Sequence, residues 1–117
     1  LSALIGDLHE SGMLEETLVV LTTEFGRTPK INQNAGRDHY PKAFSAMLAG
    51  GGVKGGFVYG KTDEKGSEPV ENPVTIGDFN ATIAYGCGLP LDQRLFSKNA
   101  RPFTVANHGD PVMELFS

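Results

Sequence analysis

The stretch Thr17-Leu-Val-Val-Leu-Thr-Thr-Glu-Phe-Gly-Arg-Thr-Pro29 decides the predicted fold. Residues 17–23 are apolar on both faces, a pattern typical of a central, parallel strand that helices cover. This run ends abruptly at Glu24, which is followed by an aromatic residue, a glycine and Arg27. In an open α/β sheet, ligands and metals bind at the carboxyl ends of the strands, so we expect a functional site directly after residue 23.

A second polar cluster, Gly36-Arg-Asp-His-Tyr40, lies further along the same segment. Residues 24–41 form a long polar loop, and loops of such length are usually functional or disordered. Asp38 and His39 precede residues 43–49, which we predict as a second buried strand. A carboxylate and an imidazole suit a cation such as zinc or manganese, unless Asp38 only orients the His39 ring. The alternative is an ordinary surface turn, in which Asp38 bonds its own loop backbone.

Two arginines, Arg27 and Arg37, flank this loop. A guanidinium group matches two oxygens of a sulfate or phosphate in bidentate fashion, so the pair indicates an anion-binding site. The alternative is a pair of solvated surface charges. Glu24 likewise has two interpretations, as a ligand at the end of a strand or as a solvated residue that caps neighbouring backbone.

Local signals predict the helices and turns. Residues 1–11 have the apolar spacing of an amphipathic helix, which Gly12 ends. The clearest helix begins at Thr75, because Asp78 stands at the position of a capping-box acid. Three successive glycines at residues 50–52 predict a turn with unusual backbone angles.

Composition limits the function classes. The 117 residues suffice for one domain, and 39% of them are hydrophobic. Ten basic against fourteen acidic residues give a net charge of −4 without a basic run, which argues against nucleic acid as a partner. No apolar run reaches the length of a membrane span. The single cysteine, Cys87, cannot form an intramolecular disulfide, and we expect it to be buried. The chain opens at Leu1 without an initiator Met or a signal peptide, so we interpret it as a piece of a longer protein.

Three features in the same order resemble sulfatases and other hydrolases of the alkaline phosphatase superfamily. They are the strand that ends in acid-aromatic-glycine at residues 24–26, the Asp38-His39 pair before a strand, and the helix Asp78-Phe-Asn-Ala-Thr-Ile-Ala-Tyr-Gly-Cys-Gly-Leu-Pro90. More closely, the chain resembles the C-terminal part of an uncharacterised sulfatase-like domain-of-unknown-function family. The motifs of that family are T-E-F-G-R-T-P, G-R-D-H-[WY] and G-G-G-x-x-G, which stand here at residues 23–29, 36–40 and 50–55.

The resemblance implies an α/β, alkaline-phosphatase-like fold: a mostly parallel sheet flanked by helices, with residues 1–117 as the C-terminal portion of a single domain. It implies that Glu24, Asp38 and His39 bind a divalent metal ion, namely zinc, calcium or manganese. It also implies that Arg27 and Arg37 bind the substrate.

Phe25 departs from the family pattern, because it stands where a metal-binding His is usual and a phenyl ring cannot coordinate a cation. Either Asp38 compensates, or the site holds one metal ion instead of two, or catalysis has been lost.

The resemblance therefore implies a metal-dependent hydrolase of sulfate or phosphate esters, acting on small molecules or glycans. Its nucleophile lies outside this chain, so the catalytic residue is unknown. The alternative is a non-catalytic binding or structural protein that retains the hydrolase fold. By the same resemblance we expect an exported or periplasmic full-length protein. A sheet cut from a larger domain has exposed edges, so we expect the isolated chain to self-associate.

Overall fold

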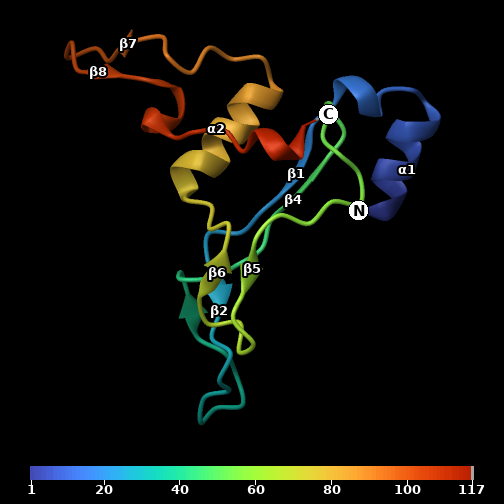
Figure 1. Ribbon diagram of the computed structural model, residues 1–117, viewed down its shortest axis with the longest axis vertical. Coiled ribbons are helices and arrows are strands. Elements are labelled where there is room, and N and C mark those ends of the chain that lie inside the picture. Colours follow the sequence, from blue (N-terminus) through green and yellow to red (C-terminus); the bar gives the residue numbers. More distant parts are fainter. Residues whose placement is uncertain (117) are drawn as a thin grey trace. The chain divides into compact units, whose positions relative to one another are not determined.

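The computed structural model describes residues 1–116, in which two α-helices accompany several short strands (Figure 1). Helix α1 (Ser2–Glu10) is followed by Gly12, whose φ of 74° favours glycine. Helix α2 (Ile76–Gly86) begins after Thr75, and both hydrogen bonds of the capping box to Asp78 are present. Both predicted helices are confirmed. Their ends could be predicted from the sequence because capping residues and glycine stops act on neighbouring residues only.

The strands are two or three residues long and pair two at a time. Strand β1 (Val19–Leu21) pairs with β4 (Met47–Ala49). The other strands form three antiparallel hairpins: β2 (Gly26–Arg27) with β3 (His39–Tyr40), β5 (Lys61–Thr62) with β6 (Pro69–Glu71), and β7 (Leu95–Phe96) with β8 (Pro102–Phe103). Short helical turns η1 (Leu14–Glu16), η2 (Val105–His108) and η3 (Met113–Leu115) complete the described elements.

The predicted fold class, an α/β alkaline-phosphatase-like fold with a mostly parallel sheet flanked by helices, is wrong. Among residues 1–116 there are only small two-stranded antiparallel sheets and no parallel one. Parallel neighbours need a crossover of about a dozen residues or more, usually a helix. The segment between β1 and β4 instead folds back on itself as the β2–β3 hairpin. Leu21 is 51% exposed, so the apolar run is not covered on both faces either.

The described chain divides into two compact units. The first contains Leu1–Val19, Ala49–Phe57 and the segment from Val74 onward, and the second contains Val20–Leu48 and Val58–Pro73. Within residues 1–116, all of the buried residues belong to the first unit: Ala81, Thr82, Ala84, Thr104 and Val112. The second unit buries no described residue, so hydrogen bonds within and between its hairpins carry a large share of its organisation.

The core of the first unit forms where the segment before the C-terminus meets α2. Thr82 is only 1% exposed, and its hydroxyl donates a hydrogen bond to the carbonyl of Asp78 at 2.7 Å. The same hydroxyl oxygen accepts a hydrogen bond from the Val112 N–H at 2.9 Å. One buried threonine therefore joins two segments that lie thirty residues apart in the sequence.

The predicted glycine turn is confirmed. Gly50, Gly51 and Gly52 have φ values of 74°, 57° and 82°. At Gly50 a side chain would also collide with the backbone carbonyls of Leu14 and Thr17, so the close approach of two chain segments requires glycine here.

The accessible surface of the chain is large for its mass. It amounts to 8731 Å², whereas two separate compact units of these sizes would together expose about 7,400 Å². Among the described residues, fifteen large hydrophobic ones are exposed, including Val58 at 85% and Phe96 at 66%. Neither helix of the described residues has the length and apolar character that a membrane-crossing helix requires.

Candidate functional site

The β2–β3 hairpin brings four of the five predicted site residues onto one ribbon and its loop. Its register pairs Gly26 with Tyr40 and Arg27 with His39. Directly opposed residues of an antiparallel pair share a face, and so do residues two apart along a strand. Phe25, Arg27 and His39 therefore lie on the same face of the hairpin.

Contacts on this face follow from that arrangement. The Phe25 ring stacks on the His39 imidazole with a centroid distance of 3.9 Å and an interplanar angle of 25°. The Arg27 guanidinium carbon lies 5.7 Å from the centroid of the Phe25 ring. The phenyl ring thus positions one imidazole and one guanidinium beside each other, by stacking and by a cation–π contact.

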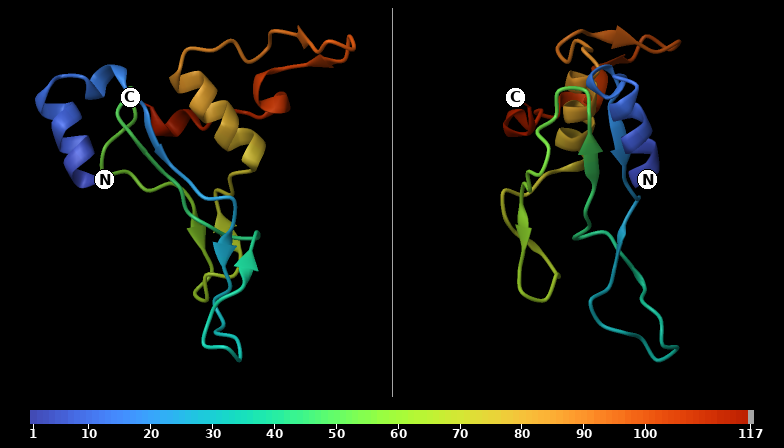
Figure 2. Two further views of the ribbon diagram at one scale, coloured as in Figure 1. Left: turned by 180° about the vertical axis from the view of Figure 1, so that it is seen from behind. Right: turned by 90° about the vertical axis from the view of Figure 1, so that its right-hand side faces the viewer.

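Tyr40 anchors the hairpin within the second unit. Its hydroxyl donates a hydrogen bond to the Ser67 carbonyl at 2.9 Å, and Ser67 stands in the loop of the β5–β6 hairpin. Figure 2 shows the ribbons of the β2–β3 hairpin in cyan to teal and of the β5–β6 hairpin in yellow-green. Gly26 permits close packing, because a side chain there would meet the Ala43 carbonyl. The exposed ion pair between Lys42 and Glu68 at 3.3 Å adds little, since solvent screens it.

Asn32 organises the loop between β2 and β3. Its side-chain oxygen accepts hydrogen bonds from the N–H groups of Asn34 and Gly36, both at 3.0 Å, and its amide nitrogen donates to the Asp38 carboxylate at 2.9 Å. Where the loop closes, the Thr28 N–H donates to the Asp38 carbonyl at 3.0 Å. The Asp38 N–H in turn donates to the Thr28 hydroxyl at 3.1 Å. The loop is therefore ordered by its own side chains before any ligand binds.

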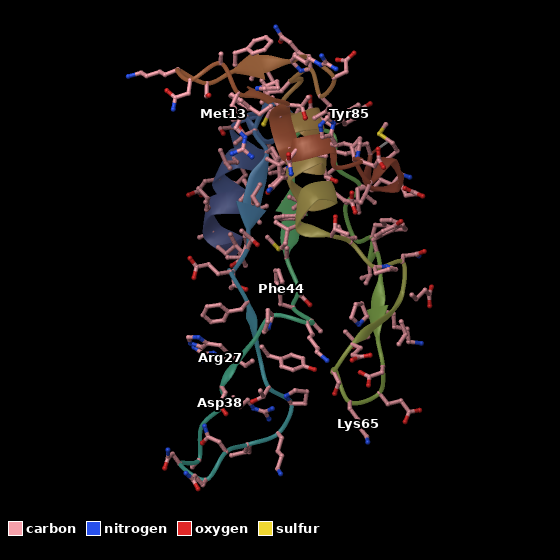
Figure 3. The ribbon with its side chains drawn as sticks, turned by 90° about the vertical axis from the view of Figure 1, so that its left-hand side faces the viewer. Met13, Arg27, Asp38, Phe44, Lys65 and Tyr85 are labelled. Atoms are coloured by element: carbon pink, nitrogen blue, oxygen red, sulfur yellow. The ribbon has the colours of Figure 1, made fainter. Side chains whose placement is uncertain are left out.

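Both arginines hold this loop in place. Arg27 donates from Nη1 to the Arg37 carbonyl at 3.2 Å. Arg37 donates from Nη1 to the Thr28 carbonyl at 2.8 Å and also to the Pro29 carbonyl. Figure 3 shows Arg27 and Asp38 on the same hairpin. A guanidinium has five N–H donors, and in the hydrogen bonds of the described residues each arginine uses Nη1 alone. Nε and Nη2 therefore stay available to an anion.

The structure does not assemble the predicted metal ligands. Glu24 is exposed and makes no hydrogen bond or ion pair within residues 1–116. Asp38 bonds Asn32, and His39 stacks on Phe25. In the described part of the chain, no group of three or more His, Cys, Asp or Glu residues could hold a metal ion. These residues alone do not fit a metal centre, and metal binding by Glu24, Asp38 and His39 stays a prediction.

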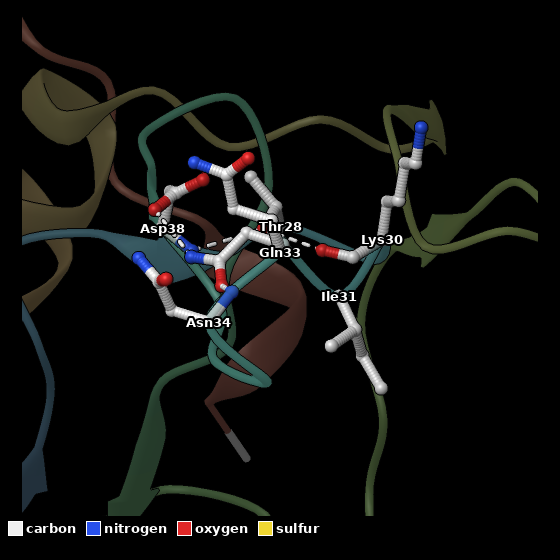
Figure 4. Close-up of a pocket in the computed structure, with 7 residues that line it drawn as sticks. Thr28, Lys30, Ile31, Gln33, Asn34 and Asp38 are labelled. Carbon is white, nitrogen blue, oxygen red and sulfur yellow. Dashed lines mark hydrogen bonds between the residues drawn. The ribbon is translucent and has the colours of Figure 1, made fainter.

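A shallow concavity of about 490 Å³ lies on the loop (Figure 4). Its lining is mostly polar and comprises Thr28, Lys30, Ile31, Asn32, Gln33, Asn34 and Asp38. Sequence reasoning missed Thr28 and Asn32. The signal was present in Asn32-Gln-Asn-Ala-Gly36, because Asn side chains often bond backbone two residues further on.

The fold and the site define a small α- and β-containing chain whose polar side chains gather on an antiparallel hairpin. The chain belongs to the family described as Protein of unknown function (DUF1501), whose model matches residues 1–116. This confirms the predicted domain-of-unknown-function family. No curated protein matches the sequence, and no solved structure matches it either.

Proposed function

We propose that this chain is the anion-binding part of a hydrolase of sulfate or phosphate esters. The observation that supports it best is the β2–β3 hairpin, which brings Arg27, Arg37 and His39 together. The Nε and Nη2 donors of both arginines make no hydrogen bond within the described residues. The motifs at residues 23–29 and 36–40, which resemble those of sulfatases, support the reaction class and the wider superfamily assignment. Export of the full-length protein is part of the same proposal.

The chemistry of the hairpin suits an ester anion. Each charge-assisted hydrogen bond from a guanidinium to such an anion is worth about 1.5–3 kcal/mol. The Nη1 hydrogen bonds of Arg27 and Arg37 already hold the loop in one conformation, so an anion that binds loses little affinity to the entropic cost of ordering the loop. The nucleophile is expected outside this chain. Zinc, calcium or manganese would polarise the ester, and it would need ligands beyond the described residues.

Arg27→Gln in the full-length parent protein tests the proposal. We expect hydrolysis of 4-nitrophenyl sulfate or 4-nitrophenyl phosphate, with kcat/KM lowered about tenfold or more in the variant, since one charge-assisted bond to the anion is lost. Arg101→Gln is the matched control, because Arg101 is exposed on a different hairpin, and its kcat/KM should equal that of the parent. Equal kinetics of the parent and Arg27→Gln, or no turnover of either ester, would refute the proposal.

A second candidate function is the binding of a sulfated or phosphorylated glycan without hydrolysis. The stack of Phe25 on His39 favours this function. Phe25 stands where the sulfatase pattern has a second metal-binding residue, and its phenyl ring covers one face of the His39 imidazole. This function predicts saturable binding of a sulfated glycan that Arg27→Gln weakens, together with no ester hydrolysis by the full-length protein.

A further inference from the structure

We infer a second anion-binding site in the first unit, at the base of the β7–β8 hairpin, for a small organic phosphate or carboxylate with an apolar group. It does not rest on the proposed function, because the β2–β3 hairpin belongs to the second unit. A cavity of about 220 Å³ marks the site. Its lining residues are Arg94, Pro102, Phe103, Thr104 and His108.

The chemistry of the lining determines the class of ligand. Among the lining residues, Arg94 carries a planar fork of donors, His108 carries a ring N–H and Thr104 carries a hydroxyl. Phe103 and Pro102 provide apolar walls. No carboxylate from the described part of the chain lines the cavity. A volume below the usual 300 Å³ or so of a drug-sized pocket suits a compact molecule with one anionic end.

Local charge strengthens this assignment. Residues 93–104 contain Arg94, Lys98 and Arg101 and no acidic residue, although the whole chain has a net charge of −4. A positive segment in an otherwise acidic protein attracts anions to its own surface.

The Thr104 hydroxyl is held in place before any ligand arrives, whereas Arg94 and His108 are exposed. Thr104 is only 9% exposed, and its hydroxyl oxygen accepts a hydrogen bond from the His108 N–H at 3.2 Å. Within residues 1–116 the hydroxyl proton itself has no acceptor, so it can be donated to an anion in the cavity.

The backbone before His108 is unusual as well. Ala106, Asn107 and His108 have φ values of 60°, 48° and 65°, three successive left-handed residues that are not glycine. Such conformations are unfavourable for residues other than glycine and persist only where the surroundings impose them. Here the Asp110 N–H donates to the Asp78 carboxylate at 2.9 Å and holds the segment against α2.

A titration with phenyl phosphate, followed by NMR of the histidine rings, tests the site. The chain has three histidines, so His108 reports on this cavity, His39 on the β2–β3 hairpin, and His9 on neither. We expect a saturable shift of the His108 signals and none at His9. Inorganic phosphate should bind more weakly, since it cannot use the wall formed by Phe103.

Two variants and a control make the test specific. Arg94→Gln should weaken the binding of phenyl phosphate about tenfold, the effect of losing one charge-assisted hydrogen bond. His108→Asn should weaken it too, while keeping a residue that tolerates the left-handed backbone. Arg101→Gln should change nothing, because Arg101 does not line the cavity.

Several outcomes would overturn the inference. They are the absence of a saturable His108 shift, equal affinity of Arg94→Gln and the unaltered chain, and an equal loss in Arg101→Gln, which would indicate diffuse attraction to the hairpin. A shift confined to His39 would also overturn it, and would instead support anion binding by the β2–β3 hairpin.

Discussion

Thr82→Val should destabilise the first unit, although valine has nearly the shape of threonine. The substitution removes the hydroxyl that accepts from the Val112 N–H, and Val112 is itself only 9% exposed. A buried N–H without a partner costs about 1–3 kcal/mol. Losing the bond to the Asp78 carbonyl adds less, because a helical carbonyl has its own donor four residues on. Helix propensity is about equal for the two residues, so the expected loss in the free energy of unfolding is about 1–3 kcal/mol.

Urea unfolding followed by circular dichroism measures this loss. The chain contains no Trp, and both α-helices belong to the first unit, so the helical signal reports on the right part of the protein. Thr82→Ser is the matched control, because it keeps the hydroxyl and loses one methyl group, worth about 0.8 kcal/mol. Thr82→Val should therefore be the less stable variant. If it equals or exceeds the original chain in stability, the Thr82–Val112 bond does not join the two segments.

Three further results are expected. Gly26→Ala should lower the unfolding midpoint of the second unit by an amount equivalent to about 1–3 kcal/mol, since the new methyl group meets the Ala43 carbonyl. Gly36→Ala, in the same unit, would meet only ordinary contacts with Asn32 and should be nearly neutral, and equal midpoints of the two variants would contradict this. The Thr75 hydroxyl, followed by the Asp110 and Thr75 amides, lowers the pKa of Asp78 below its ordinary 3.8. The ionised Asp78 carboxylate therefore stabilises the folded state above pH 3.8, and this contribution is lost as the pH falls through the lowered pKa. Thermal melts across this range should show that loss in the original chain but not in Asp78→Asn. Sedimentation should show concentration-dependent association of the isolated chain, because it exposes more surface than two compact units would, and a clean monomer at high concentration would refute this.

The sequence predicts those elements whose signals are local. The capping box of α2 needs only Thr75 and Asp78, and the glycine turn at residues 50–52 needs only backbone freedom. The sheet was mispredicted because an apolar run such as residues 17–23 does not reveal what covers it. Its length and composition suit a buried parallel strand as well as the partly exposed antiparallel strand that is observed. Which of the two forms depends on partners that lie far away in the sequence.

The buried face of α2 shows the same limit. Hydrophobicity selects Ile76 and Cys87 for the core, yet Ile76 is 57% exposed and Cys87 is also exposed. Ala84, which the same apolar spacing also selects, is buried as predicted, and Ala81 is buried as well, because small side chains let another segment approach the helix closely. The candidate site was predicted in part, because the residues of the hairpin lie close together in the sequence. The hydrogen bond from Asn32 to the Asp38 carboxylate was not predicted, because it depends on how the loop closes.

The buried bond between Thr82 and Val112 has a consequence for proteolysis. A protease needs an extended, detached stretch of substrate, which backbone fixed to a core does not supply. Here the Val112 amide is fixed to α2, and the Lys54 N–H holds the Leu115 carbonyl at 2.8 Å. Cleavage within residues 112–116 therefore requires the core of the first unit to open first. The rate of nicking in this segment should follow the opening of α2, while the loops of the second unit are cut long before.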